Sequence, residues 1–148
     1  LIPAANKKLA EMIESMKGIN EIPYKLSIDS AQDFLSLSLI SIVTSGTASL
    51  ESAVLGSVPI ICYKTNKLNY AILSRLVSTP FVGLPNLLLQ DHIFPELIQR
   101  DLTPDAIVNS FSKISSEPEK YQSYLSQIND SMLGEGFEVA AGAIDNLL

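Results

Sequence analysis

The chain is 148 residues long, with 47% hydrophobic and 18% charged residues, which is typical of a globular protein of one domain and excludes a disordered one. Its formal net charge of -6 comes with no lysine or arginine cluster, so we expect no nucleic-acid partner. The single cysteine, Cys62, excludes a disulfide within the chain and fits the cytoplasm. Its place in an apolar run indicates a small core residue rather than a nucleophile.

The apolar segments and the first residues of the chain indicate whether it crosses a membrane and whether it is a fragment. No apolar segment reaches the roughly 18 residues that a membrane-spanning helix needs, and no signal-peptide pattern is present, so we expect a soluble protein. Leu1, Ile2 and Pro3 have the pattern of a strand that leads into a helix, and there is no initiator methionine. We therefore expect the chain to be a fragment of a longer protein.

The first 39 residues predict a helix, a short strand and a second helix. Apolar residues recur every three or four positions over 4–17, which predicts an amphipathic helix. Alternation over 24–28 predicts a strand, and Asp29 or Ser30 can cap a helix that runs to Leu39. The buried side of that second helix is expected to consist of Phe34, Leu35 and Leu37.

The middle of the chain alternates apolar strands with helices. Strands are predicted at 40–44 and 59–63, with a helix at 48–55 that stops at Gly56. Such alternation is typical of a parallel sheet with helices on both faces, in which ligands bind at the carboxyl ends of the strands. We expect the apolar side chains of both strands to be buried: Ile40, Ile42, Val43, Ile60, Ile61 and Cys62.

The turn after the first of these strands is the main candidate site. If Ser45 caps the following helix and Gly46 lets the backbone come close, the amides of Gly46, Thr47 and Ala48 point outward from a helix N-terminus, which favours an anion. Glu51 lies one turn further on, where its carboxylate could accept hydrogen bonds from vicinal hydroxyls. The pattern therefore suits a sugar nucleotide better than a bare phosphate. An ordinary capped helix in an α/β domain is the alternative.

A further helix is predicted at 68–77 and a short strand at 81–84, followed by a turn at Pro85 and Asn86. Arg75 in that helix is more often a solvated residue than a phosphate ligand. Asn86 is the better candidate, because a short amide held by a rigid turn can donate and accept at a cleft. Turn chemistry alone explains Asn86 equally well.

The rest of the chain predicts helices at 104–114, capped by Thr103, and at 118–132 and 137–148. His92 has no accompanying serine or cysteine nucleophile pattern, so we interpret it as structural. The chain contains no Cys/His metal spacing and no carboxylate pair arranged for acid and base chemistry. We expect neither a metal nor another cofactor.

Two stretches of the chain carry a family resemblance: SGTASLESAVLGSVPIICYKTNKLNYAILSRLV and, after it, TPFVGLPNLLLQDHIFPELIQRDLTPDAI. With them the chain resembles the C-terminal half of bacterial lipid-A-disaccharide synthase over roughly 1–148. Ser-Gly-Thr with a following Glu recurs across nucleotide-sugar transferases of the two-domain GT-B type. The Leu-Pro-Asn-Leu-Leu run, with Pro-Glu-Leu and Thr-Pro after it, points to this one family. Two departures, Lys64 in place of an arginine and Ser49 between Ala48 and Leu50, look tolerable.

The resemblance implies a Rossmann-like domain of a GT-B glycosyltransferase that acts in lipid A and lipopolysaccharide biosynthesis in Gram-negative bacteria. The reaction transfers 2,3-diacylglucosamine from UDP-2,3-diacylglucosamine to 2,3-diacylglucosamine 1-phosphate with inversion, and UDP leaves. By resemblance, the diphosphate contacts Ser45, Gly46, Thr47 and Ala48, the ribose contacts Glu51, and Asn86 lies at the donor cleft. These residue roles are expectations from the resemblance.

The resemblance also implies an arrangement of parts. Residues 1–116 are expected to form the nucleotide-sugar-binding domain, with its first strand and a Gly/Arg-containing loop missing before Leu1, and 117–148 to form helices that dock elsewhere or exchange between subunits. The general base is expected in an N-terminal half outside this chain, so we expect no transferase activity and weak UDP binding from the chain alone. The intact enzyme is expected to be a cytoplasmic homodimer, with peripheral contact to the inner membrane through its other half.

Two rival interpretations remain open. Another UDP-sugar transferase of GT-B type, such as one in peptidoglycan synthesis, would share the Ser-Gly-Thr and Glu geometry without the Leu-Pro-Asn-Leu run. A non-catalytic interaction domain would not bind UDP.

Overall fold

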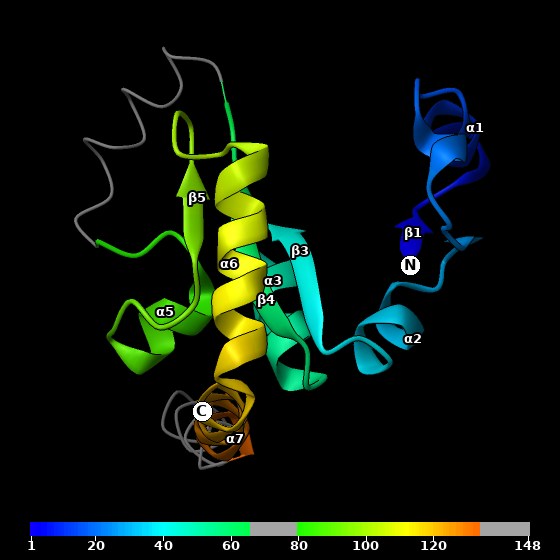
Figure 1. Ribbon diagram of the computed structural model, residues 1–148. Helices are drawn as coiled ribbons and strands as arrows, with labels where there is room; N and C mark the ends of the chain where they lie inside the picture. The colour runs from blue at the N-terminus through cyan, green and yellow to red at the C-terminus, as the bar shows by residue number, and fades with distance from the viewer. Residues whose placement is uncertain (66–79, 134–148) are drawn as a thin grey trace, which may run out of the picture.

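The computed structural model describes residues 1–65 and 80–133 (Figure 1). Within these ranges parallel strands are flanked by helices, so the chain has the predicted α/β, Rossmann-like fold. The elements in chain order are β1 (Ile2–Ala4), α1 (Lys7–Glu14), the 3-10 helix η1 (Ile19–Glu21), β2 (Leu26–Ile28), α2 (Ala31–Ser36), β3 (Ile40–Thr44), α3 (Thr47–Val54), β4 (Val58–Tyr63), α5 (Leu84–Leu89), β5 (Glu96–Ile98), α6 (Pro104–Ser116) and α7 (Pro118–Leu133).

The described strands form two parallel sheets, β1-β2 and β3-β4-β5. β4 lies in the centre of the larger sheet, with Ile60 opposite Ile42 of β3 and Ile61 opposite Glu96 of β5. Ile60 and Ile61 are fully buried. This burial explains the apolar sequence of β4, because a central parallel strand is covered on both faces. The two strands predicted at 40–44 and 59–63 are confirmed, the second starting one residue earlier.

Four expectations of burial in these strands are wrong, and Ile40 and Val43 are among them because both are only half-buried. Ile42 is 61% exposed, because β3 pairs only with β4 among the described strands and its other edge is open. Cys62 is half-buried near the end of β4. Burial nevertheless raises the pKa of the Cys62 thiol, which disfavours the thiolate and agrees with a role other than nucleophile.

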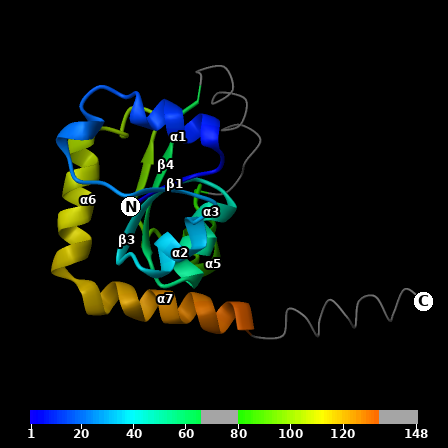
Figure 2. The same cartoon turned by 90° about the vertical axis from the view of Figure 1, so that its right-hand side faces the viewer.

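Helices cover both faces of the larger sheet (Figure 2). α6 lies on one side, α3 and α5 lie on the other, and α7 crosses below the ends at which the strands begin. The core joins apolar residues of β4 to Tyr121, Leu125 and Ile128 of α7, all nearly or fully buried. The described part of the predicted segment 117–148 therefore packs into the same core as the sheet. The expected domain boundary at 116/117 stays a prediction.

The N-terminal helices are shorter than predicted. α1 begins after Asn6, whose side-chain oxygen accepts a hydrogen bond from the Leu9 amide at 3.0 Å, and its apolar face is largely exposed. α2 begins after Ser30 and buries Phe34. Leu37, expected on the buried side, is exposed because it follows the last residue of α2.

The segment after the undescribed residues differs from the prediction. No strand is assigned at 81–84, and Pro85 and Asn86 lie in the first turn of α5 rather than in a loop. Proline is favoured in that position because its missing N–H would have no partner within the helix. β5 was not predicted, since three residues show too little alternation to indicate a strand. The predicted helices at 68–77, with Arg75, and at 137–148 lie outside the described residues.

The C-terminal helices of the described range are confirmed. Thr103 precedes α6 with an extended backbone, and its hydroxyl accepts a hydrogen bond from the Ala106 amide at 3.2 Å. α7 follows directly after Glu117. None of the helices in the two described ranges has the length and apolar character needed to cross a membrane.

The cap of α6 gives a first prediction. Thr103→Ala should lower the free energy of unfolding by about 1 kcal/mol, because the Ala106 amide loses its capping acceptor. Urea denaturation of the purified chain measures the change. Thr103→Ser keeps the hydroxyl and should cost less than half as much; equal losses in both variants would show that the threonine methyl, not the cap, matters.

Candidate nucleotide-sugar site

The candidate site is the turn between β3 and α3, at the carboxyl end of a parallel strand. Thr44 ends β3 and Thr47 begins α3, so only Ser45 and Gly46 connect the two elements. The Ser45 amide donates to the Cys62 carbonyl of β4 at 3.2 Å, which continues the strand pairing into the turn. The first amides of α3 are thereby held at the edge of the sheet where ligands of open α/β sheets bind.

Ser45 does not cap α3, contrary to the prediction. Gly46 occupies the N-cap position, and the helix has no side-chain cap there. The Ser45 hydroxyl instead donates to the Val82 carbonyl at 2.7 Å, and the Ser49 hydroxyl turns back to the Gly46 carbonyl at 2.7 Å. Because the first turn of α3 also contains no acidic residue, its leading amides keep their capacity to bind an anion from outside.

Gly46 is required by its backbone conformation. Its φ of 121 and ψ of -157 lie in a region that only glycine adopts readily. A Cβ at this position would meet no heavy atom within 4 Å, so the constraint is not lack of space. The glycine lets the chain leave β3 and enter α3 within two residues, as the sequence pattern indicated.

Glu51 lies on the second turn of α3 and is half-buried. Its Oε1 atom accepts a hydrogen bond from Gln32 Nε2 of α2 at 2.8 Å. This contact holds the carboxylate on the side of α3 that faces α2. One carboxylate oxygen is thereby engaged within the protein. The sequence pattern did not predict this partner, because Gln32 is 19 residues away.

Asn86 is fully buried and makes four hydrogen bonds inside the protein. Its amide nitrogen donates to the Phe94 carbonyl at 2.8 Å and to Glu96 Oε1 at 2.9 Å. Its oxygen accepts from the amides of Ile93 and Phe94 at 3.1 and 2.8 Å. Asn86 therefore ties α5 to the segment that leads into β5. Its expected place at the donor cleft stays a prediction.

Glu96 completes this network, and the sequence interpretation missed it. Its carboxylate accepts from the amides of Val82 and Gly83 at 3.0 and 2.9 Å, besides its contact with Asn86. A Cβ at Gly83 would overlap the Cδ1 atom of the buried Ile61, so any larger residue there would require Ile61 to move. An acidic residue inside the apolar run Phe-Pro-Glu-Leu-Ile was the available signal, because such a residue needs partners when half-buried.

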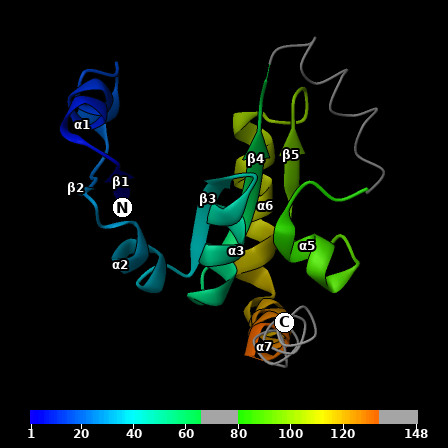
Figure 3. The same ribbon diagram turned by 180° about the vertical axis from the view of Figure 1, so that it is seen from behind.

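The network reaches the candidate turn through one contact. Val82 donates its amide to Glu96 and offers its carbonyl to Ser45, so the turn after β3, the start of α5 and β5 form one connected unit. α3 and α5 also pack side by side on the same face of the sheet (Figure 3). Ser45 thus serves to position the turn.

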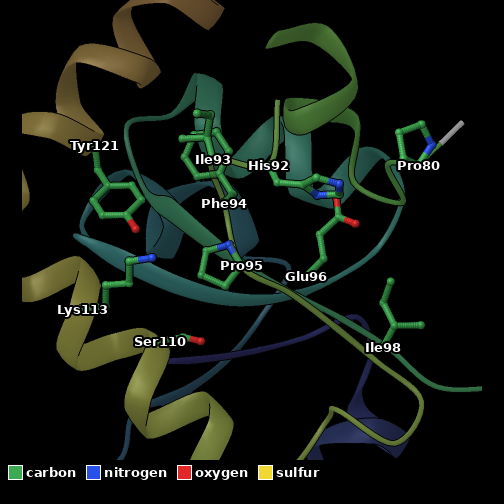
Figure 4. Close-up of a pocket in the computed structure, with 10 residues that line it drawn as sticks. All are labelled: Pro80, His92, Ile93, Phe94, Pro95, Glu96, Ile98, Ser110, Lys113 and Tyr121. Atoms are coloured by element: carbon green, nitrogen blue, oxygen red, sulfur yellow. The ribbon is translucent and has the colours of Figure 1, made fainter. Parts of the chain in front are cut away.

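A separate cavity of about 350 Å³ lies between α6 and the segment before β5 (Figure 4). His92, Glu96, Lys113 and Tyr121 are among its lining residues, and none of the predicted site residues is. The centroids of the His92 and Phe81 rings lie 4.7 Å apart. The structural role expected of His92 stays a prediction. The cavity and the β3–α3 turn are distinct features of the fold.

Comparison with known proteins identifies the family. The model of the family described as lipid-A-disaccharide synthetase matches residues 1–139. The chain belongs to the lipid-A-disaccharide synthetase family. It is 32% identical to a lipid-A-disaccharide synthase of Alcanivorax borkumensis over all of its length, and 36% identical to that of Cellvibrio japonicus over 81% of its length. It spans 40% and 32% of those two proteins.

The match to the lipid-A-disaccharide synthetase family covers every residue of the candidate turn and of the hydrogen-bond network around Asn86 and Glu96. A third relative, from Pseudomonas putida, is 30% identical over the whole chain, which again makes up 40% of the relative's length. The resemblance expected from the Ser-Gly-Thr-Ala and Leu-Pro-Asn-Leu runs is confirmed at the level of the family.

The network predicts that Asn86 is a major determinant of stability. Asn86→Ala should lower the free energy of unfolding by about 2–4 kcal/mol, because buried amides and the Glu96 carboxylate lose their partners together. Asn6→Ala is a matched control, since Asn6 makes one capping bond at an exposed site and should cost about 1 kcal/mol. Similar losses in the two variants would contradict the network.

Proposed function

We propose that the chain is the C-terminal, UDP-sugar-binding part of a lipid-A-disaccharide synthase. The whole protein would transfer 2,3-diacylglucosamine from its UDP carrier to 2,3-diacylglucosamine 1-phosphate, with inversion at the anomeric carbon. Family membership over residues 1–139 supports the class of reaction. Two relatives match this chain from end to end, and the chain makes up 40% of the length of each. The proposed transferase activity is therefore that of a protein longer than this chain.

The structure at the start of α3 is the observation that supports the proposed site. α3 begins at the carboxyl end of β3 with glycine at its N-cap, no capping side chain and no acidic residue in its first turn. The amides of Gly46, Thr47 and Ala48 would donate to the diphosphate, and the helix dipole would add favourable potential. Ser45 would hold the turn through Val82 rather than contact the ligand with its hydroxyl.

The remaining predicted residues would act beside this turn. Glu51 would use the carboxylate oxygen not engaged by Gln32 to accept hydrogen bonds from the ribose hydroxyls. Asn86 would position the start of α5 at the edge of the donor cleft, because its own polar atoms already bind Phe94, Ile93 and Glu96.

In the proposed reaction the acceptor hydroxyl attacks the anomeric carbon as the bond to the UDP oxygen breaks. The hydroxyl proton passes to a general base in the part of the protein outside this chain, and UDP leaves with the bonding electrons. The chain's contribution is to stabilise the departing diphosphate with fixed donors. The chain alone would therefore have no transferase activity, and turnover by the purified chain would contradict this division of roles.

We further propose that the intact enzyme is a homodimer in the cytoplasm, with peripheral contact to the inner membrane through its other half. The lipid character of both proposed substrates supports such contact. No metal or other cofactor is part of the proposal, since the reaction needs a base and anion stabilisation only.

Thr47 allows a direct test of the diphosphate contact. Thr47→Pro removes one donor amide but suits the first position of a helix, so the fold should tolerate it. UDP affinity of the whole protein, measured by calorimetry, should fall at least about tenfold, the worth of one charge-assisted hydrogen bond. Thr47→Ala keeps the amide and should bind within about threefold of the wild type.

The outcomes separate the candidate functions. Equal affinities for Thr47→Pro and Thr47→Ala would place the diphosphate elsewhere. No UDP binding by the unaltered protein would favour a non-catalytic interaction domain. UDP binding without transfer to a 2,3-diacylglucosamine 1-phosphate acceptor would favour another UDP-sugar transferase, such as one of the peptidoglycan type.

A further inference from the structure

Three polar side chains line the cavity of about 350 Å³ and make no hydrogen bond within the described part of the chain. They are the Ser110 hydroxyl, the Lys113 amine and the Tyr121 hydroxyl. In Figure 4 the Tyr121 hydroxyl and the Lys113 amine point toward each other, and the Ser110 hydroxyl points toward Pro95. A few convergent polar groups in a hollow that is otherwise apolar are typical of a small-molecule site.

Tyr121 of α7 is the most informative of the three residues. It is only 2% exposed, and its ring centroid lies 6.3 Å from that of Phe94. Burial raises the pKa of the Tyr121 phenol, so the hydroxyl stays neutral and can donate. Buried tyrosines normally hydrogen-bond their hydroxyl groups. Because no described residue does so here, we expect the partner of the hydroxyl to enter from the cavity.

The cavity has one lysine without a paired carboxylate. Lys113 forms no salt bridge in the described ranges. Glu117, four residues further along the chain, instead accepts from Lys120 at 2.6 Å. The Glu96 carboxylate already accepts from three N–H donors, and in Figure 4 Pro95 lies between it and Lys113. The end of the cavity formed by α6 and α7 therefore favours an anion.

The rest of the lining limits the size and character of a ligand. Ile93, Pro95 and Ile98 line the cavity with apolar side chains and are half-buried. A volume of 350 Å³ lies near the lower end for small-molecule sites, and it has room for about a dozen non-hydrogen atoms at roughly 30 Å³ each. The ligand should therefore be small, with an apolar body beside its charged group.

We propose that this cavity binds a small organic monocarboxylate with about ten non-hydrogen atoms. A carboxylate only accepts hydrogen bonds, and its two oxygens can be shared among the three donors of Ser110, Lys113 and Tyr121. Its single negative charge matches the single lysine, whereas a phosphate monoester would bring nearly two charges. The apolar body would lie against Pro95 and Ile98. The proposal does not depend on UDP binding, because the β3–α3 turn is elsewhere in the fold.

A titration of the ¹⁵N-labelled chain with phenylacetate, followed by amide chemical shifts, tests the site. Phenylacetate should bind with a dissociation constant of about 1 mM, the order that ligands of some ten atoms reach. The largest shifts should occur at Ser110, Lys113 and Tyr121. Phenylacetamide has the same shape without the charge and should bind at least about tenfold more weakly. Phenyl phosphate should bind no more tightly than phenylacetate.

Two variants test the donors. Tyr121→Phe removes only the hydroxyl, and Lys113→Met keeps most of the side-chain length while it removes the charge. Each should weaken phenylacetate binding about tenfold. Tyr124→Phe and Lys8→Met are matched controls, since neither residue lines the cavity, and both should bind within about twofold of the unaltered chain.

The melting temperature of Tyr121→Phe gives a second measurement. Because the hydroxyl has no partner among the described residues, its removal should leave the melting temperature within about two degrees. A fall of about five degrees or more would show that the hydroxyl serves the fold, and it would overturn the proposal.

Three results of the titrations would also overturn it. They are equal binding of phenylacetate and phenylacetamide, phenylacetate affinity unchanged in both Tyr121→Phe and Lys113→Met, and phenyl phosphate binding about tenfold more tightly than phenylacetate. An absence of shifts at about 20 mM phenylacetate would do the same. None of these results bears on UDP, whose proposed contacts are at the start of α3.

Discussion

The Glu96 carboxylate is the constraint on which the rest of the site depends. It gathers the amides of Val82 and Gly83 and the side chain of Asn86, and Val82 passes the connection on to Ser45. Burying part of a carboxylate is costly unless donors bind it, and here the donors come from the segment before α5 and from α5 itself. The turn after β3 is therefore fixed by hydrogen bonds to the segment before α5 and, through it, to β5.

This arrangement explains why the turn can leave its helix amides uncommitted. In most helices a serine, threonine or aspartate side chain binds the first amides. Here the Ser45 hydroxyl is engaged by Val82 and the Ser49 hydroxyl by the Gly46 carbonyl. The leading amides of α3 have no side-chain cap, and the network rather than a cap fixes their position.

The sequence predicted the strands and helices whose pattern is local. β3, β4, α6 and α7 were recognised because apolar periodicity and caps lie within each segment. The role of Ser45 was assigned wrongly because its partner is 37 residues away, and the strand predicted at 81–84 was wrong because Pro85 starts a helix. Glu96 was missed for a related reason: its partners come from a loop and a helix that only the fold brings together.

The larger sheet ends at β3 among the described strands. Ile42 was expected to be buried from its apolar pattern and is 61% exposed, because β3 pairs there with β4 alone. The local pattern predicts that a strand forms, whereas the burial of its side chains depends on which neighbours cover it.

The proposed function depends on the binding of the UDP diphosphate by the amides at the start of α3. A titration of the ¹⁵N-labelled 148-residue chain with UDP, followed by amide chemical shifts, tests it most directly. The amides of Gly46, Thr47 and Ala48 should show the largest shifts, with smaller ones at Glu51. Largest shifts at Lys113 and Tyr121 beside the separate cavity, or none at millimolar UDP, would contradict it.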